Sequence, residues 1–181
     1  SYNYSINSGH TNPTAITQGY TLTSSIDVAT SSYFNAPQAY TPDGNKLVNS
    51  LQNDDKLTGT ASATDTLDAT LGNPNDNGQA LIMPTLNGIE ILNLKFDSTS
   101  NNMVLDLQDS TGVTTINVSR IAEGFAATVQ NIADATATNL SVNNSFSPNN
   151  GVSFTYIASA VSGVDTADLT LNNVNTAWVR L

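Results

Sequence analysis

Few residues in this sequence have side chains that do chemistry on their own. The chain has no cysteine and a single histidine, His10. Without cysteine it has no disulfide, thiolate zinc site or cysteine nucleophile. A Ser-His-Asp triad or a histidine-based zinc site would have to use His10, which lies in a polar N-terminal stretch without an accompanying G-x-S-x-G sequence. We therefore expect no catalysis by His10.

Paired carboxylates are a second chemical possibility, because glycoside hydrolases use them, and the chain has two glutamates, Glu90 and Glu123. Glu90 alternates with Ile89 and Ile91, and this alternation places it on the solvent face of a strand. The sequence also has no phosphate-binding loop and no dinucleotide-binding fingerprint. These observations predict a protein that is not an enzyme and needs no organic cofactor.

Oxygen ligands for a metal ion are concentrated in one short stretch. Ca²⁺ prefers oxygen and takes six to eight ligands. The candidate ligands are Asn53, Asp54, Asp55, Asp65 and Asp68. Asp and Asn are also ordinary turn formers, so an irregular Ca²⁺ site and metal-free turns both remain open. For Asn73–Gly78 (NPNDNG) the turn interpretation is favoured, because Pro and Gly explain the cluster without a metal.

The overall charge excludes some partners. Five basic and fifteen acidic residues give a net charge of -10. We expect no nucleic acid as partner, because few groups could release phosphate counterions, and no binding to a bare anionic membrane for the same reason. We also expect no membrane insertion, since no apolar run reaches the roughly 18 residues of a membrane span. The acidic excess either keeps the surface soluble or holds Ca²⁺.

The elements that must position these residues are short strands. Residues 1–19 are polar and read as an arm or linker, and residues 20–181 as a single β-rich domain of short Thr, Val, Ile and Leu runs between turn residues. Alternation is clearest at Ile89–Leu94, Met103–Leu107 and Thr115–Val118. Weak helical signals remain at 45–51, and the apolar spacing at 121–132 fits a helix or a strand.

The strands recur at nearly regular spacing. With Leu94, Leu105, Ile116, Val129 and Leu140 as markers, the gaps are 11, 11, 13 and 11 residues. Short strands at such intervals are typical of a β-solenoid or β-roll, in which each strand stacks on its counterpart in the next coil. An Ig-like β-sandwich gives a similar spacing. We predict an all-β solenoid or roll-like stack, with the Ig-like sandwich as the alternative.

Five blocks, in their order along the chain, resemble a segment common in large bacterial S-layer proteins and RTX-type adhesins. The blocks are Tyr20–Asp27 (YTLTSSID), Leu51–Gly59 (LQNDDKLTG), Ala63–Leu71 (ATDTLDATL), Leu86–Leu94 (LNGIEILNL) and Thr111–Asn117 (TGVTTIN). The resemblance spans about residues 20 to 175, and no single block is a sharp motif. It implies a secreted, extracellular structural role at the bacterial cell surface and Ca²⁺-dependent folding or lattice assembly.

The chain departs from that family at the metal-binding turn. In the RTX nonapeptide, glycines permit a tight turn and an aspartate binds Ca²⁺ between coils. The stretch Thr60–Leu67 (TASATDTL) keeps the Asp-x-Leu pair of Asp65 and Leu67 but has Thr or Ala where the glycines belong. We therefore do not expect a regular RTX calcium ladder here.

Two hypotheses for function follow. The first is a structural lattice or spacer unit of an S-layer or adhesin protein, whose partners are neighbouring copies or flanking domains and whose export signal lies outside this fragment. The second is a module that binds surface polysaccharide or another ligand through Asn, Thr and aromatic side chains. Edge strands with few charges also predict weak self-association. Trp178, near the C-terminal end, is expected to cover the last strand.

Overall fold

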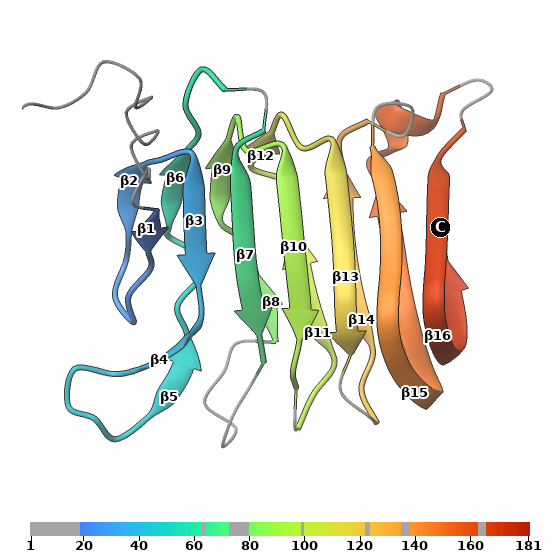
Figure 1. Cartoon of the computed structure of the whole chain (residues 1–181), viewed down its shortest axis with the longest axis horizontal. Coiled ribbons are helices and arrows are strands. Elements are labelled where there is room, and N and C mark those ends of the chain that lie inside the picture. The colour runs from blue at the N-terminus through green and yellow to red at the C-terminus, as the bar shows by residue number, and fades with distance from the viewer. Residues whose placement is uncertain are drawn as a thin grey trace, which may run out of the picture.

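A computed structural model describes residues 19–62, 64–72, 80–98, 100–121, 124–134, 138–162 and 166–181. In these residues the chain winds into a parallel β-solenoid of about five turns (Figure 1). The solenoid prediction is confirmed. The Ig-like alternative is wrong, because strand neighbours in the two larger sheets pair in parallel rather than antiparallel.

The strands are mostly short, and the last two are long. In chain order they are β1 (Tyr20–Thr21), β2 (Val28–Thr30), β3 (Tyr33–Ala36), β4 (Gln38–Tyr40), β5 (Leu47–Asn49), β6 (Lys56–Thr58), β7 (Thr66–Leu71), β8 (Leu81–Ile82), β9 (Thr85–Asn87), β10 (Ile91–Phe96), β11 (Met103–Asp106), β12 (Ser110–Thr111), β13 (Thr115–Ile121), β14 (Ala127–Ile132), β15 (Asn139–Tyr156) and β16 (Asp168–Arg180). A short 3-10 helix, η2 (Ala158–Val161), follows β15. No helix in the described part of the chain is long and apolar enough to cross a membrane.

Three walls surround the core. The first wall stacks β1, β3, β7, β10, β13 and the first parts of β15 and β16, and the second stacks β8, β11, β14 and the last parts of β15 and β16. The third wall is the four-stranded sheet of β2, β6, β9 and β12. An antiparallel hairpin of β4 and β5 projects from the N-terminal half (Figure 1).

One coil of the central stack takes 24 residues. Leu92 of β10 pairs with Ile116 of β13, which pairs with Leu140 of β15, and the paired residues are 24 apart. On the second wall Leu105 of β11 pairs with Val129 of β14 at the same spacing. The spacing of about 11 residues in the sequence is therefore half a coil, because successive marker residues alternate between the first and second walls.

The core fills the space between the walls. The inward column of the first wall is Leu67, Leu92, Ile116 and Leu140, and each is at most 2% exposed. Burying such a side chain contributes roughly 1.5–3 kcal/mol. The alternation of buried and partly exposed residues along β7 and β10 is the period-two pattern that the sequence shows.

The weak helical signals correspond to strands. The 45–51 stretch contains β5, and the 121–132 stretch contains β14. Val129 of β14 lies between Leu105 of one coil and Phe154 of the next. Pairing with coils on both sides therefore overrides the local preference of a short apolar run, which does not distinguish a helix from a strand.

Candidate functional site

Polar side chains on the outer surface of the first wall form a row that crosses several coils. Asn93 Nδ2 donates to Asp68 Oδ1 at 2.7 Å, and Asn117 Nδ2 donates to Asn93 Oδ1 at 2.9 Å. Ser141 Oγ donates to Asn117 Oδ1 at 2.6 Å. We call Asp68, Asn93, Asn117 and Ser141 the polar ladder. Each of its bonds joins one coil to the next, so the row holds the stack together from outside while the core holds it from inside.

The N-terminal end of the ladder carries an aromatic residue. The Tyr33 hydroxyl donates to Asp68 Oδ2 at 2.7 Å, and the Tyr33 side chain is 38% exposed. The hydrogen bond to the Asp68 carboxylate raises the pKa of Tyr33, and burial of the phenol adds to the effect. Tyr33 therefore stays a neutral hydrogen-bond donor at ordinary pH.

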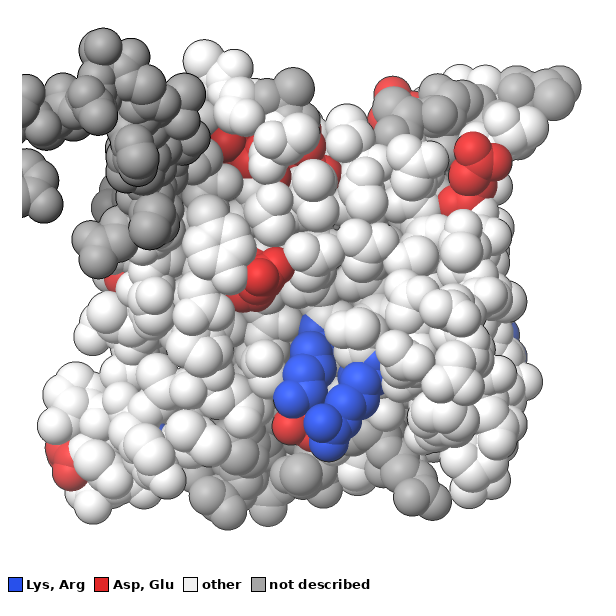
Figure 2. Space-filling model, viewed as in Figure 1, with Lys and Arg blue, Asp and Glu red and all other residues white. Residues whose placement is uncertain are grey.

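A shallow groove lies beside the ladder, with a volume of about 300 Å³. Its lining consists of Asn35, Asp68, Ala69, Thr70, Asn93, Lys95 and Ser119. Figure 2 shows two basic side chains side by side over β10 and β13, and the basic residues of these strands are Lys95 and Arg120. Amide, hydroxyl, carboxylate and ammonium groups are therefore within one small surface, a combination that suits a hydroxyl-rich ligand.

Two aspartates occupy matching corners of the third wall. Asp55 Oδ1 accepts the N–H of Asp27 at 2.8 Å, and Asp55 Oδ2 accepts the N–H of Gln52 at 2.8 Å. Asp27 in turn accepts the Tyr20 hydroxyl at 2.7 Å and the N–H of Thr23 at 2.8 Å. Both carboxylates are buried. They satisfy backbone donors where the chain turns a corner, which is the ordinary structural use of aspartate in turns.

A second pair of carboxylates lies where the third wall passes into the first. Asp65 accepts the N–H of Thr60, and the Thr60 hydroxyl donates to Asp65 Oδ1 at 3.0 Å. Glu90 Oε2 accepts the N–H of Asp65 at 2.9 Å. Glu90 lies just before β10 rather than within a strand, and it is partly buried. The prediction of a strand position for Glu90 is wrong, and its carboxylate has a structural use in joining neighbouring coils.

Four of the five candidate calcium ligands have separate hydrogen-bonding roles. Asn53 Oδ1 accepts the N–H of Met83 at 3.0 Å, Asp55 and Asp65 hold corner donors, and Asp68 belongs to the ladder. Asp54 is exposed. Within the described ranges, three or more His, Asp or Glu side chains do not gather at any point in a way that could hold a metal ion. The calcium site stays a prediction.

Burial changes the acidity of Asp55. Loss of solvation raises its pKa to about 6, and the nearby charges of Asp27 and Asp54 act in the same direction, against the two backbone N–H donors. Asp106 behaves differently. Burial acts to raise its pKa, but hydrogen bonds from Asn131, Gln130 and the N–H of Gln108 outweigh that effect and lower it.

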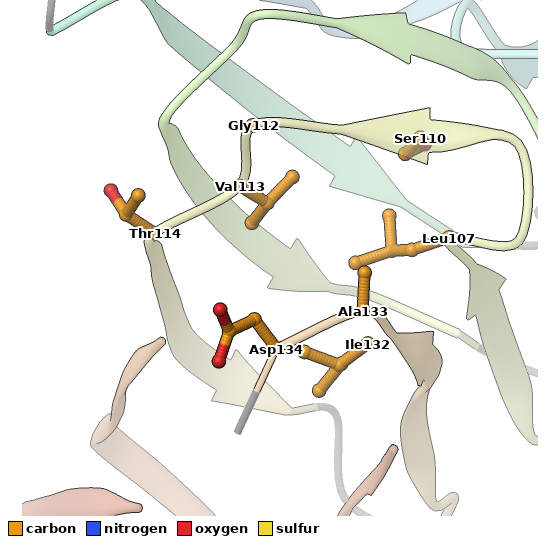
Figure 3. Close-up of a pocket in the computed structure, with 8 residues that line it drawn as sticks. All are labelled: Leu107, Ser110, Gly112, Val113, Thr114, Ile132, Ala133 and Asp134. Carbon is orange, nitrogen blue, oxygen red and sulfur yellow. The ribbon is translucent and has the colours of Figure 1, made fainter. Parts of the chain in front are cut away.

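A pocket of about 230 Å³ opens beside β12 (Figure 3). Its lining residues are Leu107, Ser110, Gly112, Val113, Thr114, Ile132, Ala133 and Asp134. Figure 3 shows Thr114 and Asp134 on one side of the pocket and Leu107 and Ser110 on the other. The Ser110 hydroxyl is buried without a hydrogen-bond partner among the described residues. The two hydroxyls of Ser110 and Thr114 and the carboxylate of Asp134, on otherwise mainly aliphatic walls, suit a small, largely apolar group.

Several residues singled out from the sequence lie outside the described ranges. They are His10, Glu123, the Asn73–Gly78 cluster and most of the 1–19 arm. The polar ladder, in contrast, does not follow from the local sequence patterns described above. The sequence does contain a regular spacing, because Asn93, Asn117 and Ser141 follow one another at intervals of 24 residues. That spacing indicates a contact only once the length of one coil is known.

No protein-family model, curated protein or solved structure matches this chain.

Proposed function

We propose that this chain is a non-catalytic structural domain of a secreted bacterial cell-surface protein of the S-layer or adhesin type, acting as a lattice or spacer unit. The observation that supports this proposal is the polar ladder. Aspartate and asparagine often build binding and catalytic sites. In this chain the side chains of Asp68, Asn93 and Asn117 instead form hydrogen bonds from one coil to the next. Their chemistry is used to keep the stack rigid.

A stack of this kind suits a spacer. Adjacent strands lie about 4.8 Å apart, so the seven stacked strands of the first wall hold the two ends of the solenoid roughly 29 Å apart. An apolar core inside and hydrogen bonds outside resist bending. In the proposed role the domain keeps neighbouring domains or neighbouring copies at a set distance outside the cell, and Ca²⁺ bound near Asn53, Asp54, Asp55, Asp65 and Asp68 would add stability.

Labelling of intact cells tests this proposal. Antibodies raised against the folded chain are applied to unopened cells that make the protein, and electron microscopy follows gold-labelled antibody. We expect dense labelling over the whole outer surface, and its loss when the surface layer is stripped. Label found only after the cells are opened would refute the cell-surface role.

The groove beside the ladder favours a second candidate function, which is binding of surface polysaccharide. Tyr33, whose hydroxyl bonds to the groove residue Asp68, offers an exposed ring for stacking on a sugar, and Asn35 and Lys95 offer polar groups within the groove. A glycan array followed by calorimetry tests this function. Tyr33→Ala should weaken any saturable binding at least tenfold, whereas Tyr40→Ala, which removes an exposed tyrosine from the β4–β5 hairpin, should not. Equal effects of the two variants on binding would exclude the groove as the polysaccharide-binding site.

A further inference from the structure

The C-terminal end of the solenoid is open. One edge of β16 pairs with β15, and no described strand pairs with its other edge, which lies at the right-hand end of the stack in Figure 1. An unpaired strand edge of 13 residues presents a row of N–H and C=O groups to any chain that can add a strand.

Apolar side chains accompany this free edge. Leu169, Leu171 and Val179 are in register with the buried core residues Leu140, Val142 and Val152 of β15. Leu171 is nevertheless 53% exposed. A groove of about 650 Å³ follows β16, and its lining includes Leu169, Leu171, Val174 and Val179. The end of the stack therefore exposes an apolar surface of the kind that is buried between neighbouring coils elsewhere in the solenoid.

We propose that a second copy of this chain covers this end, with the two β16 strands paired antiparallel about a twofold axis at Val174. This arrangement places Asp168 of each copy opposite Arg180 of the other. Leu169 then faces Val179. The first pair lies on the outer surface of the wall and the second faces inward in both copies, since Leu169 and Val179 continue core columns. This register therefore pairs opposite charges at Asp168 and Arg180, and pairs core-facing side chains at Leu169 and Val179.

The shape of β16 agrees with such an axis. The register between β15 and β16 shifts between Ser147 and Gly151, where the chain passes from the first wall to the second. On β16 this shift lies between Thr176 and Trp178, and the backbone also has a positive φ at Asn173. The strand thus has two arms, 168–172 and 178–180, joined by a corner segment, 173–177, that contains Val174. A twofold axis through the corner exchanges the two arms, so each arm of one copy lies over the other arm of its partner, as an isologous interface requires.

The opposite end of the solenoid fits β16 less well. Its described edge strands are β1 and β8, with two residues each, and β2, with three. Head-to-tail stacking would leave most of the 13-residue edge of β16 unpaired. Self-pairing instead uses both arms of β16 and forms two Asp168–Arg180 pairs for each dimer. In the single chain the Arg180 guanidinium lies 4.4 Å from the centre of the Trp178 ring, where it is exposed and accessible to a partner.

A charge-swap experiment tests the register. Sedimentation velocity over a range of protein concentrations should show a monomer–dimer equilibrium for the wild-type chain. Asp168→Arg and Arg180→Asp each turn two attractive pairs into two repulsive ones, and each should raise the dimer Kd roughly tenfold. The double variant Asp168→Arg/Arg180→Asp restores opposite charges and should recover the wild-type Kd. Lys46→Asp, which changes the charge on the distant β4–β5 hairpin by the same amount as Arg180→Asp, is the control and should have no effect.

A second variant acts through the inward side of the strand. Leu171→Lys puts a charge on the open core edge and should abolish the dimer, while thermal unfolding checks that the variant is folded. A strict monomer at millimolar concentration, a dimer that the charge swaps leave unchanged, or open-ended polymers in place of dimers would each overturn the proposal.

The biological meaning of the β16–β16 contact rests on the proposed cell-surface role, but the existence of the contact does not. A charge-dependent dimer in solution, together with cells that show no surface label, would refute the role and support the contact. Labelled cells and a strictly monomeric chain would do the reverse.

Discussion

Val142, on the next-to-last strand of the first wall, is fully buried, whereas Leu171, its in-register neighbour on the terminal strand β16, is 53% exposed. The two side chains are both aliphatic, point to the same side of the wall and follow the same period-two pattern. The difference between them is the number of neighbouring coils. Val142 has one on each side and Leu171 has one. In a solenoid, burial is therefore a property of position in the stack more than of residue type.

Polar residues show the same contrast. Asn117 in the middle of the stack bonds to Asn93 of the preceding coil and to Ser141 of the following one. Asn172, on the terminal strand β16, is exposed. An amide in the central coils thus holds three coils together, while one at the end faces solvent.

The largest expected effect tests the burial contrast directly. Leu94→Ala should lower the free energy of unfolding by about 2–5 kcal/mol, because it leaves a cavity between two coils. Leu171→Ala in dilute protein should cost less than about 1 kcal/mol, because most of that side chain is already in water. Equilibrium denaturation in urea measures both. Similar costs for the two variants would mean that the end coil is covered even in the monomer.

The second-largest expected effect is a dependence of stability on pH, which the buried carboxylate of Asp55 causes. Burial raises the pKa of Asp55 to about 6 in the folded chain, from 3.8. The folded state therefore holds its proton more tightly, and stability should fall as pH rises from about 4 to above 6, by about 1–3 kcal/mol. Thermal unfolding at each pH measures this. Asp55→Asn should flatten the profile in that window, and a variant that keeps the full slope would assign it to other groups.

The ladder comparison predicts a smaller difference. Asn117→Ala removes two bonds between coils and should cost about 1–2 kcal/mol. Asn172→Ala on β16 should stay within about 0.5 kcal/mol of the wild type. Denaturation curves of the two variants measure the contrast. A ladder that contributes nothing would give the same midpoint for both, and would remove the main support for the rigid-spacer proposal.

Calcium should have the smallest effect. Four of the five candidate ligands already accept hydrogen bonds within the chain, so we expect weak binding. When the Ca²⁺ concentration equals Kd, binding to the folded state adds only about 0.4 kcal/mol. Thermal unfolding in EDTA and then in millimolar Ca²⁺ measures the shift. A rise of many degrees that Asp54→Asn or Asp68→Asn abolishes would locate a strong site at the predicted ligands.

Part of the fold was predictable from local patterns. The alternation at Ile89–Leu94 and Thr115–Val118 indicated strands, and the marker spacing indicated a stack of coils. The spacing alone did not show that neighbouring markers belong to different walls. It also did not show that Asn93 and Asn117 lie side by side, because a contact across 24 residues depends on the length of the coil and of both corners. The candidate metal ligands illustrate the same limit. They are close in sequence, but Asp55 and Asp65 bond backbone and hydroxyl donors at different corners, and Asp68 belongs to the ladder.

What the sequence by itself determined is the all-β class, the inward and outward sides of most strands, and the absence of cysteine chemistry, because these depend on residue types and on a period of two. The tertiary structure alone decided the parallel pairing, the three walls, the polar ladder and the open edge at β16. The physical reason is that coil-to-coil register is a long-range property. It is set by how the core columns and hydrogen bonds of whole coils match, and each residue contributes to it only once its neighbours above and below are in place.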